Sequence, residues 1–224
     1  MTANGRMGGK ILADGLKAQG VDAIFGVPGE SFLALLDGLY DQRDTIRFIT
    51  CRQEGGAANM AEAYGKLTGR PGVCVVTRGP GATNASVGLH TAFQDSTPMI
   101  LLVGQVGREM LDREAFQEVN HQIFFSEMSK WSAEIKDASR IPEYLSHAFH
   151  VALSGRPGPV VLSLPEDMLR DVAAVEDAPR AIPVQPAPTI EQMSEVREML
   201  KNAERPLMIL GGSGWSPEAC RFIT

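Results

Sequence analysis

A glutamate that follows an apolar run is the first candidate for chemistry in this chain. Glu54 comes shortly after the run at residues 46–50, opens an alanine-rich segment, and is followed by Gly55 and Gly56. A glycine inside a helix costs up to about 1 kcal/mol relative to alanine, so two of them beside an acid suggest that a bulky group must approach this backbone. The alternative is an ordinary carboxylate that stabilises a helix N-terminus through the helix dipole. Taken by itself, Glu54 leaves both interpretations open.

Two glycine-containing turns also closely follow apolar runs, as Glu54 does. Residues 28–29 follow the apolar run at 23–27, and residues 79–81 follow the run at 73–77. Ligands of open α/β sheets bind at the carboxyl ends of strands, which is where such turns lie. Residues 77–84 have no Gly-Lys-Ser/Thr of a Walker loop and are not a clean dinucleotide fingerprint. A tight turn before a capped helix is the plain alternative.

The elements that must position these residues alternate between strand and helix. Unbroken apolar runs are typical of strands in a parallel sheet that helices cover on both faces. Such runs predict strands at 23–27, 46–50, 73–77, 99–103, 131–135 and 160–164. Apolar residues at helical spacing predict helices at 7–19, 31–39, 82–93 and 141–153, and one that starts near Glu54. The pattern predicts an α/β domain with a mostly parallel sheet.

Composition excludes several functional classes. The chain has 224 residues and a net charge of -6, with no run of Lys or Arg, which argues against a nucleic-acid surface. No apolar stretch approaches the roughly 20 residues that a membrane span needs. The three cysteines have no CxxC spacing, so we expect free thiols and a cytoplasmic protein. The histidines at 147 and 150 lack an evident third ligand, so we expect no metal site.

The chain changes character after its last predicted strand. We expect one domain at 1–172, a proline-rich linker at 173–189, and the beginning of a truncated central domain at 190–224. In that last part, a helix is predicted at 190–202 and a strand within 205–214. One strand and one turn cannot bury a core, so we expect the chain to be part of a longer polypeptide.

Six motifs in this order resemble the N-terminal pyrimidine-binding domain of thiamine-diphosphate-dependent enzymes, within the acetolactate synthase and pyruvate oxidase group. They are Gly-Val-Pro-Gly at 26–29, Glu-Gly-Gly-Ala-Ala at 54–58, Gly-Pro-Gly-Ala-Thr-Asn at 79–84, Ala-Phe-Gln-Asp-Ser-Thr-Pro at 92–98, Ala-Phe-Gln-Glu at 115–118 and Gly-Arg-Pro-Gly-Pro-Val at 155–160. The resemblance covers about residues 7 to 170. It implies a transferase or lyase that decarboxylates a 2-oxo acid and transfers the remaining fragment.

The resemblance also assigns roles to individual residues. It implies that Glu54 is catalytic, with its carboxylate on N1′ of the cofactor's aminopyrimidine ring, where proton sharing helps to activate the thiazolium C2. It implies cofactor contacts for Val27, Pro28, Gly29, Thr77, Pro80, Asn84 and Gln117. Arg156 matches an arginine that contacts FAD in flavin-binding members. Its alternative is a surface arginine that leads the chain into the last strand.

The resemblance further implies that a complete active site needs a second domain and a second subunit. Members of the group hold the diphosphate through Mg²⁺ on a separate C-terminal domain, and their active sites form between subunits. We therefore expect a homodimer or homotetramer in the full protein. We expect the chain alone to be inactive and to bind thiamine diphosphate weakly at most.

Several positions depart from the group's pattern. Gln53 and Asn59 stand where His is common, Arg78 stands where a small Ser is usual, and Glu30 stands where acetolactate synthases usually carry a second Gly. These departures keep other members of the group open, such as a sulfoacetaldehyde acetyltransferase, an oxidase or a decarboxylase. A non-catalytic cofactor-binding subunit and a general nucleotide-binding α/β module also remain as alternatives.

Overall fold

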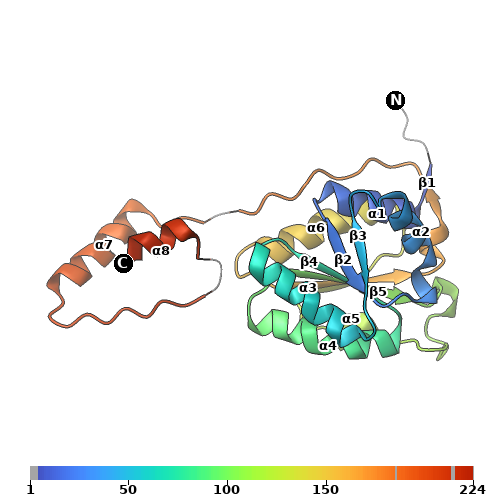
Figure 1. Ribbon diagram of the computed structural model, residues 1–224, viewed down its shortest axis with the longest axis horizontal. Coiled ribbons are helices and arrows are strands. Elements are labelled where there is room, and N and C mark those ends of the chain that lie inside the picture. The colour runs from blue at the N-terminus through green and yellow to red at the C-terminus, as the bar shows by residue number, and fades with distance from the viewer. Residues whose placement is uncertain (1–4, 185, 213–214, 224) are drawn as a thin grey trace.

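The computed structural model describes residues 5–184, 186–212 and 215–223. Its centre is a six-stranded parallel sheet with the strand order β3-β2-β4-β5-β7-β6 (Figure 1). The strands are β2 Ala23–Gly26, β3 Arg47–Thr50, β4 Gly72–Val76, β5 Met99–Gln105, β6 Trp131–Glu134 and β7 Pro159–Pro165. The six strands predicted between residues 23 and 164 and the parallel sheet are thus confirmed, with differences only at the strand ends. Two short strands, β1 Arg6–Met7 and β8 Val172–Ala173, pair antiparallel and join the two ends of the domain.

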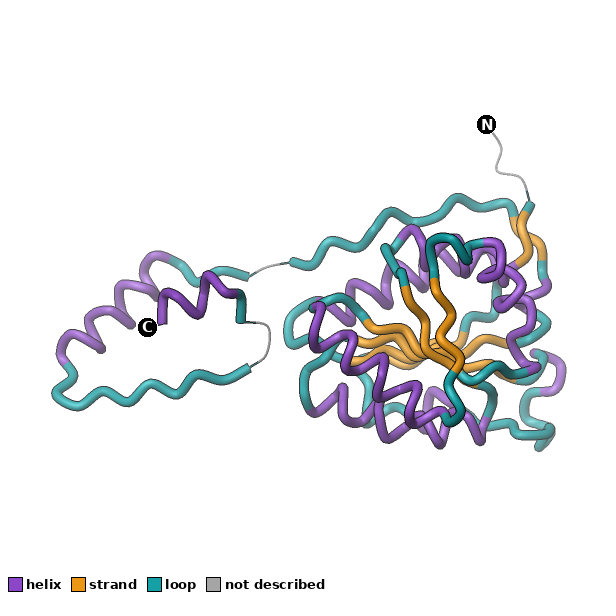
Figure 2. Tube along the Cα trace, in the orientation of Figure 1, coloured by secondary structure: helices purple, strands orange, loops and turns teal. Residues whose placement is uncertain are grey.

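Helices cover both faces of the sheet, as Figure 2 shows around the orange strands. One face carries α1 Gly8–Ala18, α2 Leu33–Asp41 and α6 Ile141–Leu153, and the other carries α3 Glu54–Thr68, α4 Gly79–Gln94 and the short α5 His121–Phe124. Successive strand residues point to opposite faces. In β4, Val73 and Val75 therefore join one core cluster, while Cys74 and Val76 join the other. This double burial explains why the strands are apolar without alternation.

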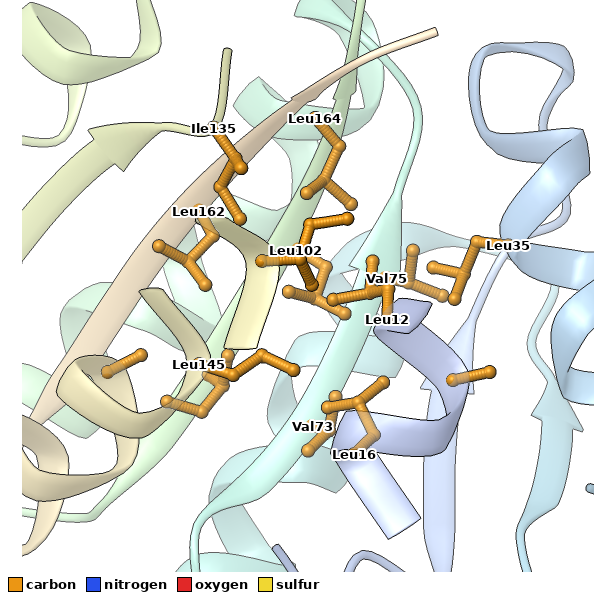
Figure 3. Packing of buried hydrophobic residues seen from close by; sticks show 14 of the residues in the cluster. Leu12, Leu16, Leu35, Val73, Val75, Leu102, Ile135, Leu145, Leu162 and Leu164 are labelled. Carbon is orange, nitrogen blue, oxygen red and sulfur yellow. The ribbon is translucent and has the colours of Figure 1, made fainter. Parts of the chain in front are cut away.

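The core under α1 and α6 is built from branched aliphatic side chains. Figure 3 shows Leu12, Leu16, Leu35 and Leu145 of the helices against Val73, Val75, Leu102 and Leu162 of the strands. Burying one such side chain stabilises the fold by about 1.5–3 kcal/mol. Cys74 lies in the opposite core, and burial raises the pKa of its thiol. It is a free thiol, as expected, and serves as a small core residue.

Two helix starts differ from the sequence prediction. Gly79, Pro80 and Gly81 are not a turn but the first turn of α4, which Arg78 precedes as the N-cap. Proline fits this position because its missing N–H would have no partner there. The helix predicted from residue 31 begins as a 3-10 turn, Glu30–Phe32, and α2 follows only at Leu33.

The segment after the domain departs further from expectation. Its linker is held against the domain by Gln19, which donates to the carbonyl of Pro179 and accepts from the amide of Ala181. It is also held by Arg6, which donates to the carbonyl of Val175 and pairs with Asp177. The helix α7, Ile190–Asn202, forms as predicted behind a capping box at Thr189, and α8 spans Pro217–Ile223. Figure 1 shows both helices apart from the sheet.

The strand predicted within 205–214 does not form, and no strand lies in its described part, 205–212. Leu207 and Ile209 are 85% and 86% exposed. A strand needs a neighbour that completes its hydrogen-bond ladder, and no strand in the described ranges pairs with this segment. Residues 213–214 lie outside the described ranges. Among the helices of the described part, none is long and apolar enough to cross a membrane.

Candidate functional site

Glu54 is the first residue of α3 and lies just beyond the carboxyl end of β3. The side chain of Gln53 caps the helix by accepting a hydrogen bond from the amide of Gly56 at 2.8 Å. The Glu54 carboxylate is half-buried, and its Oε2 accepts a hydrogen bond of 2.9 Å from Nδ2 of Asn84. Among the described residues, nothing donates to its Oε1. One oxygen is therefore held in place while the other stays available for a ligand.

Small residues bring the two helices that carry this pair into close contact. A Cβ on Gly55 would lie 3.1 Å from the carbonyl oxygen of Asn84, and a Cβ on Gly88 would lie 2.6 Å from the Cβ of Ala58. A Cβ on Gly56 would meet nothing within 4 Å. The two glycines beside Glu54 therefore have different roles. Gly55 is needed for packing against α4, whereas Gly56 leaves open space.

The turn at residues 27–29 lies against the end of the neighbouring strand. A Cβ on Gly29 would be 2.8 Å from the Cβ of Thr77, and the hydroxyls of Ser31 and Thr77 share a hydrogen bond of 2.9 Å. Val27 and Gly29 are half-buried, and Pro28 is exposed. The structure thus brings two of the predicted site residues, Gly29 and Thr77, together at the ends of neighbouring strands.

Gln117 reaches the start of α4 from a distant loop. Its carbonyl accepts a hydrogen bond of 2.9 Å from the amide of Gly79, and its φ of 64° lies in the left-handed region, which is uncommon for a residue with a side chain. A Cβ on Gly79 would be 2.9 Å from that carbonyl, so only glycine permits this approach. Pro80, the next residue, is exposed. Residues 80 and 117 therefore lie at the same edge as Asn84, which follows one turn later in α4.

Arg156 lies elsewhere. Its guanidinium bonds to Oγ of Ser96 at 2.7 Å and to the carbonyl of Gln94 at 3.0 Å, at the last turn of α4. That helix has sixteen residues and is about 24 Å long, at 1.5 Å per residue. Arg156 therefore sits at the amino edge of the sheet and caps a helix C-terminus, where a cation is stabilised by the helix dipole. This position is compatible with the alternative to FAD binding, a surface arginine that leads the chain into the last strand.

A buried polar cluster at the carboxyl edge was not foreseen. Nδ1 of His121 and Oγ of Ser163 share a hydrogen bond of 2.8 Å, and Nε2 of Gln105 donates to the carbonyl of Val119 at 2.9 Å. His121 is 2% exposed, and its Nε2 has no partner among the described residues. The signal in the sequence that could have revealed it is Gln105, a polar residue shortly after the apolar run at 99–103. The cluster holds the loop that carries Gln117.

Burial lowers the pKa of His121 to about 4, which predicts a pH-dependent stability. The unfolded chain binds a proton near pH 6.5 and the folded chain does not, so this stability is present above pH 6.5 and is lost as pH falls toward 4. We expect wild type to lose about 3 kcal/mol more than His121→Gln between pH 7 and pH 4, at about 1.4 kcal/mol per pKa unit. Denaturant unfolding at both pH values measures this.

The exposed His150 supplies the control for replacing a histidine by glutamine, and the stability of His150→Gln is measured at the same two pH values. Burial raises the pKa of the neighbouring Glu134, which shifts stability in the opposite direction. Because that group is present in every variant, it cancels in the comparison. Equal pH slopes for wild type and His121→Gln would rule out a buried neutral histidine.

Comparison with known proteins covers most of this chain. Residues 6–124 match the family described as thiamine pyrophosphate enzyme, N-terminal TPP binding domain. The chain is 37% identical to the "Probable acetolactate synthase large subunit" of Methanocaldococcus jannaschii, over 96% of this chain and 38% of that protein. It is 38% identical to the acetolactate synthase of Arthrospira platensis, over 92% and 37% of the two chains. It is 36% identical to the acetolactate synthase isozyme 2 large subunit of Escherichia coli, again over 92% and 37%. The chain spans a little over a third of the length of these relatives.

Proposed function

This chain belongs to the thiamine pyrophosphate enzyme family, and we propose that it binds the aminopyrimidine half of that cofactor, thiamine diphosphate, for a reaction on 2-oxo acids. The reaction is decarboxylation followed by transfer of the remaining fragment to an acceptor, as in an acetolactate synthase. The names of the relatives support this assignment. The activity belongs to the complete gene product, since this chain spans only part of those relatives.

The Glu54–Asn84 pair is the observation that carries the proposal. The amide of Asn84 fixes one carboxylate oxygen at 2.9 Å and leaves the other free at the carboxyl edge of the sheet. A carboxylate held this way can share a proton with a weakly basic ring nitrogen through a charge-assisted hydrogen bond. The residues present therefore fit an aminopyrimidine. When bound, the cofactor supplies the carbon nucleophile that a 2-oxo acid requires.

The neighbouring residues serve to place the ring. Val27, Pro28 and Gly29 form one wall, and the missing side chain of Gly29 lets this turn pack closely on Thr77. Pro80, in the first turn of α4, borders the cofactor, and Gln117 faces the substrate side. Glu54 holds the proton, and Asn84 orients the carboxylate.

Finer properties follow from the same family assignment. We assign Mg²⁺ to a part of the gene product beyond this chain, together with the diphosphate. FAD is an optional cofactor, toward which Arg156 would need to release its contacts with α4. A homodimer or homotetramer in the cytoplasm completes the proposal. Free thiols and a net charge of -6 agree with that compartment.

The alternatives differ in what the rest of the gene product contains. A sulfoacetaldehyde acetyltransferase, an oxidase or a decarboxylase would share the Glu54 edge and differ in the acceptor pocket. A non-catalytic subunit would bind the cofactor only beside a partner chain. A general nucleotide-binding module would tolerate loss of the Glu54 carboxylate without loss of function.

Asn84→Ala tests the proposal. It removes the amide that holds Glu54, so we expect about tenfold lower cofactor affinity, in line with a lost hydrogen bond to a charged group. Titration of the complete gene product with thiamine diphosphate, read as activity on pyruvate, measures this.

Gln94→Ala removes an amide from the far end of the same helix and serves as the control. It should leave the affinity unchanged. If Asn84→Ala and Gln94→Ala behave alike, the Glu54–Asn84 pair has no part in cofactor binding.

A further inference from the structure

Arg78 joins three loops at the carboxyl edge of the sheet. Its Nη2 donates to Oε2 of Glu166 at 2.7 Å, and its Nη1 lies 3.6 Å from Oε1 of Glu30. Glu30 follows β2, Arg78 follows β4 and Glu166 follows β7. The Arg78 side chain is only 10% exposed. A charged group this deeply buried is stable only beside partners of opposite charge.

Two departures from the family pattern meet at this contact. The resemblance predicts a serine and a glycine at the positions of Arg78 and Glu30, which are 48 residues apart in sequence. In the fold they are within ion-pair distance. A serine and a glycine could not make this contact. The two substitutions are therefore one structural feature, which we call the Arg78 clasp, made of Arg78, Glu30 and Glu166.

The clasp holds the turn that forms one wall of the proposed site. Ser31, next to Glu30, shares a hydrogen bond with Thr77, next to Arg78, so two adjacent side-chain links join the turn to the β4 end. From the other side, a Cβ on Gly104 would lie 2.1 Å from Oγ of Ser31, so the turn also rests on the end of β5. Because Gly29 touches Thr77, movement of this turn would move the wall itself.

We propose that Arg78 is a positioning residue that clasps the 28–31 turn against residues 77–78 and so holds residues 27–29 ready for the cofactor ring. The cofactor part of this inference rests on the proposed function. Both terminal nitrogens of Arg78 already face carboxylates, so its role is to position the turn rather than to bind the ligand. Glu30 is 71% exposed and contributes the weaker link.

Hydrogen–deuterium exchange of the full chain tests the clasp without any cofactor. In Arg78→Met we expect amides at 27–32 to exchange about tenfold faster, because local opening becomes easier. In Glu30→Gln we expect about a two- to threefold change, as for a solvent-exposed ion pair. In Arg78→Lys we expect exchange at 27–32 to lie between the rates of wild type and Arg78→Met. Lysine keeps the positive charge but lacks the planar guanidinium that reaches both carboxylates.

Arg6→Met is the matched control. Arg6 also bridges two carboxylates, Asp14 and Asp177, and its side chain is 20% exposed. It should leave exchange at 27–32 unchanged. Wild-type exchange in both Arg78→Met and Glu30→Gln overturns the clasp, as does a double variant whose effects simply add. If Arg78→Met fails to fold, the exposed Glu30→Gln still decides the question.

The complete gene product then separates the clasp from the proposed function. We expect Arg78→Met to raise the dissociation constant of thiamine diphosphate about tenfold while kcat at saturating cofactor is retained, as for a residue that acts through ground-state binding. Faster exchange with unchanged cofactor affinity overturns the positioning role. A wild-type protein that binds no cofactor overturns the proposed function, while the exchange result still supports the clasp.

Discussion

Glu54→Gln is expected to lower turnover of a 2-oxo acid by at least about 100-fold, the range lost when a positioned acid–base group is removed. The change keeps the size and the hydrogen-bonding capacity of the side chain, so Asn84 still has a partner. It removes the negative charge that shares a proton with the ring nitrogen. Steady-state kinetics of the complete gene product at saturating thiamine diphosphate measure the effect.

Glu143→Gln is the control that separates catalysis from helix stabilisation. Glu143 lies in the first turn of α6, as Glu54 lies in the first turn of α3, but α6 covers the opposite face of the sheet. A carboxylate at a helix N-terminus stabilises the helix by about 0.3–1 kcal/mol through the helix dipole. Both variants should lose a similar, small amount of stability. If Glu54→Gln kept wild-type turnover, Glu54 would have no catalytic role and would only stabilise the N-terminus of α3.

Gly88→Ala should give the largest loss of stability at the site. The new Cβ would lie 2.6 Å from the Cβ of Ala58, 2.7 Å from its carbonyl carbon and 2.8 Å from the amide nitrogen of Asn59. Two of these are backbone atoms of α3, so the helices must separate. We expect the free energy of unfolding to fall by about 2–3 kcal/mol, as in overpacked cores. Denaturant unfolding monitored by circular dichroism measures this.

The same substitution at Gly56 is the control. Its Cβ would meet nothing within 4 Å, so Gly56→Ala should be neutral or stabilising by up to about 1 kcal/mol through helix propensity. Gly88→Ala should also weaken cofactor binding, because Asn84 lies one helical turn before residue 88 and holds Glu54. Equal stability of the two variants would contradict close packing of α3 on α4.

The architecture was predictable because the sheet is buried on both faces. Unbroken apolar runs such as that of β5 marked each strand, and amphipathic spacing marked helices such as α6. The parallel order then placed Glu54, Thr77 and residues 27–29 at one edge. The resemblance supplied Asn84, which is separated from Glu54 by 30 residues but bonded to it in the fold.

Other features depend on contacts that no local pattern encodes. The position of Arg156 at the opposite edge follows from its bonds to the end of α4. The Arg78–Glu30 pair joins the loops that follow the adjacent strands β2 and β4, and nothing in the sequence indicated that these two residues meet. His121 carried no local signal, because its burial comes from Ser163 and Gln105 on two strands distant in sequence. The apolar run favoured a strand within 205–214, but no strand among the described residues pairs with its described part, 205–212.

The exchange of the C2 hydrogen of bound thiamine diphosphate tests the central claim most directly. It reports proton transfer at the cofactor before any substrate adds, so the acceptor and the exact 2-oxo acid do not matter. In the complete gene product, the rate measured by proton NMR after quenching in D2O should be at least about 100-fold higher in wild type than in Glu54→Gln. Equal rates in the two proteins, with the cofactor bound in both, would contradict the assignment of Glu54 as its proton partner.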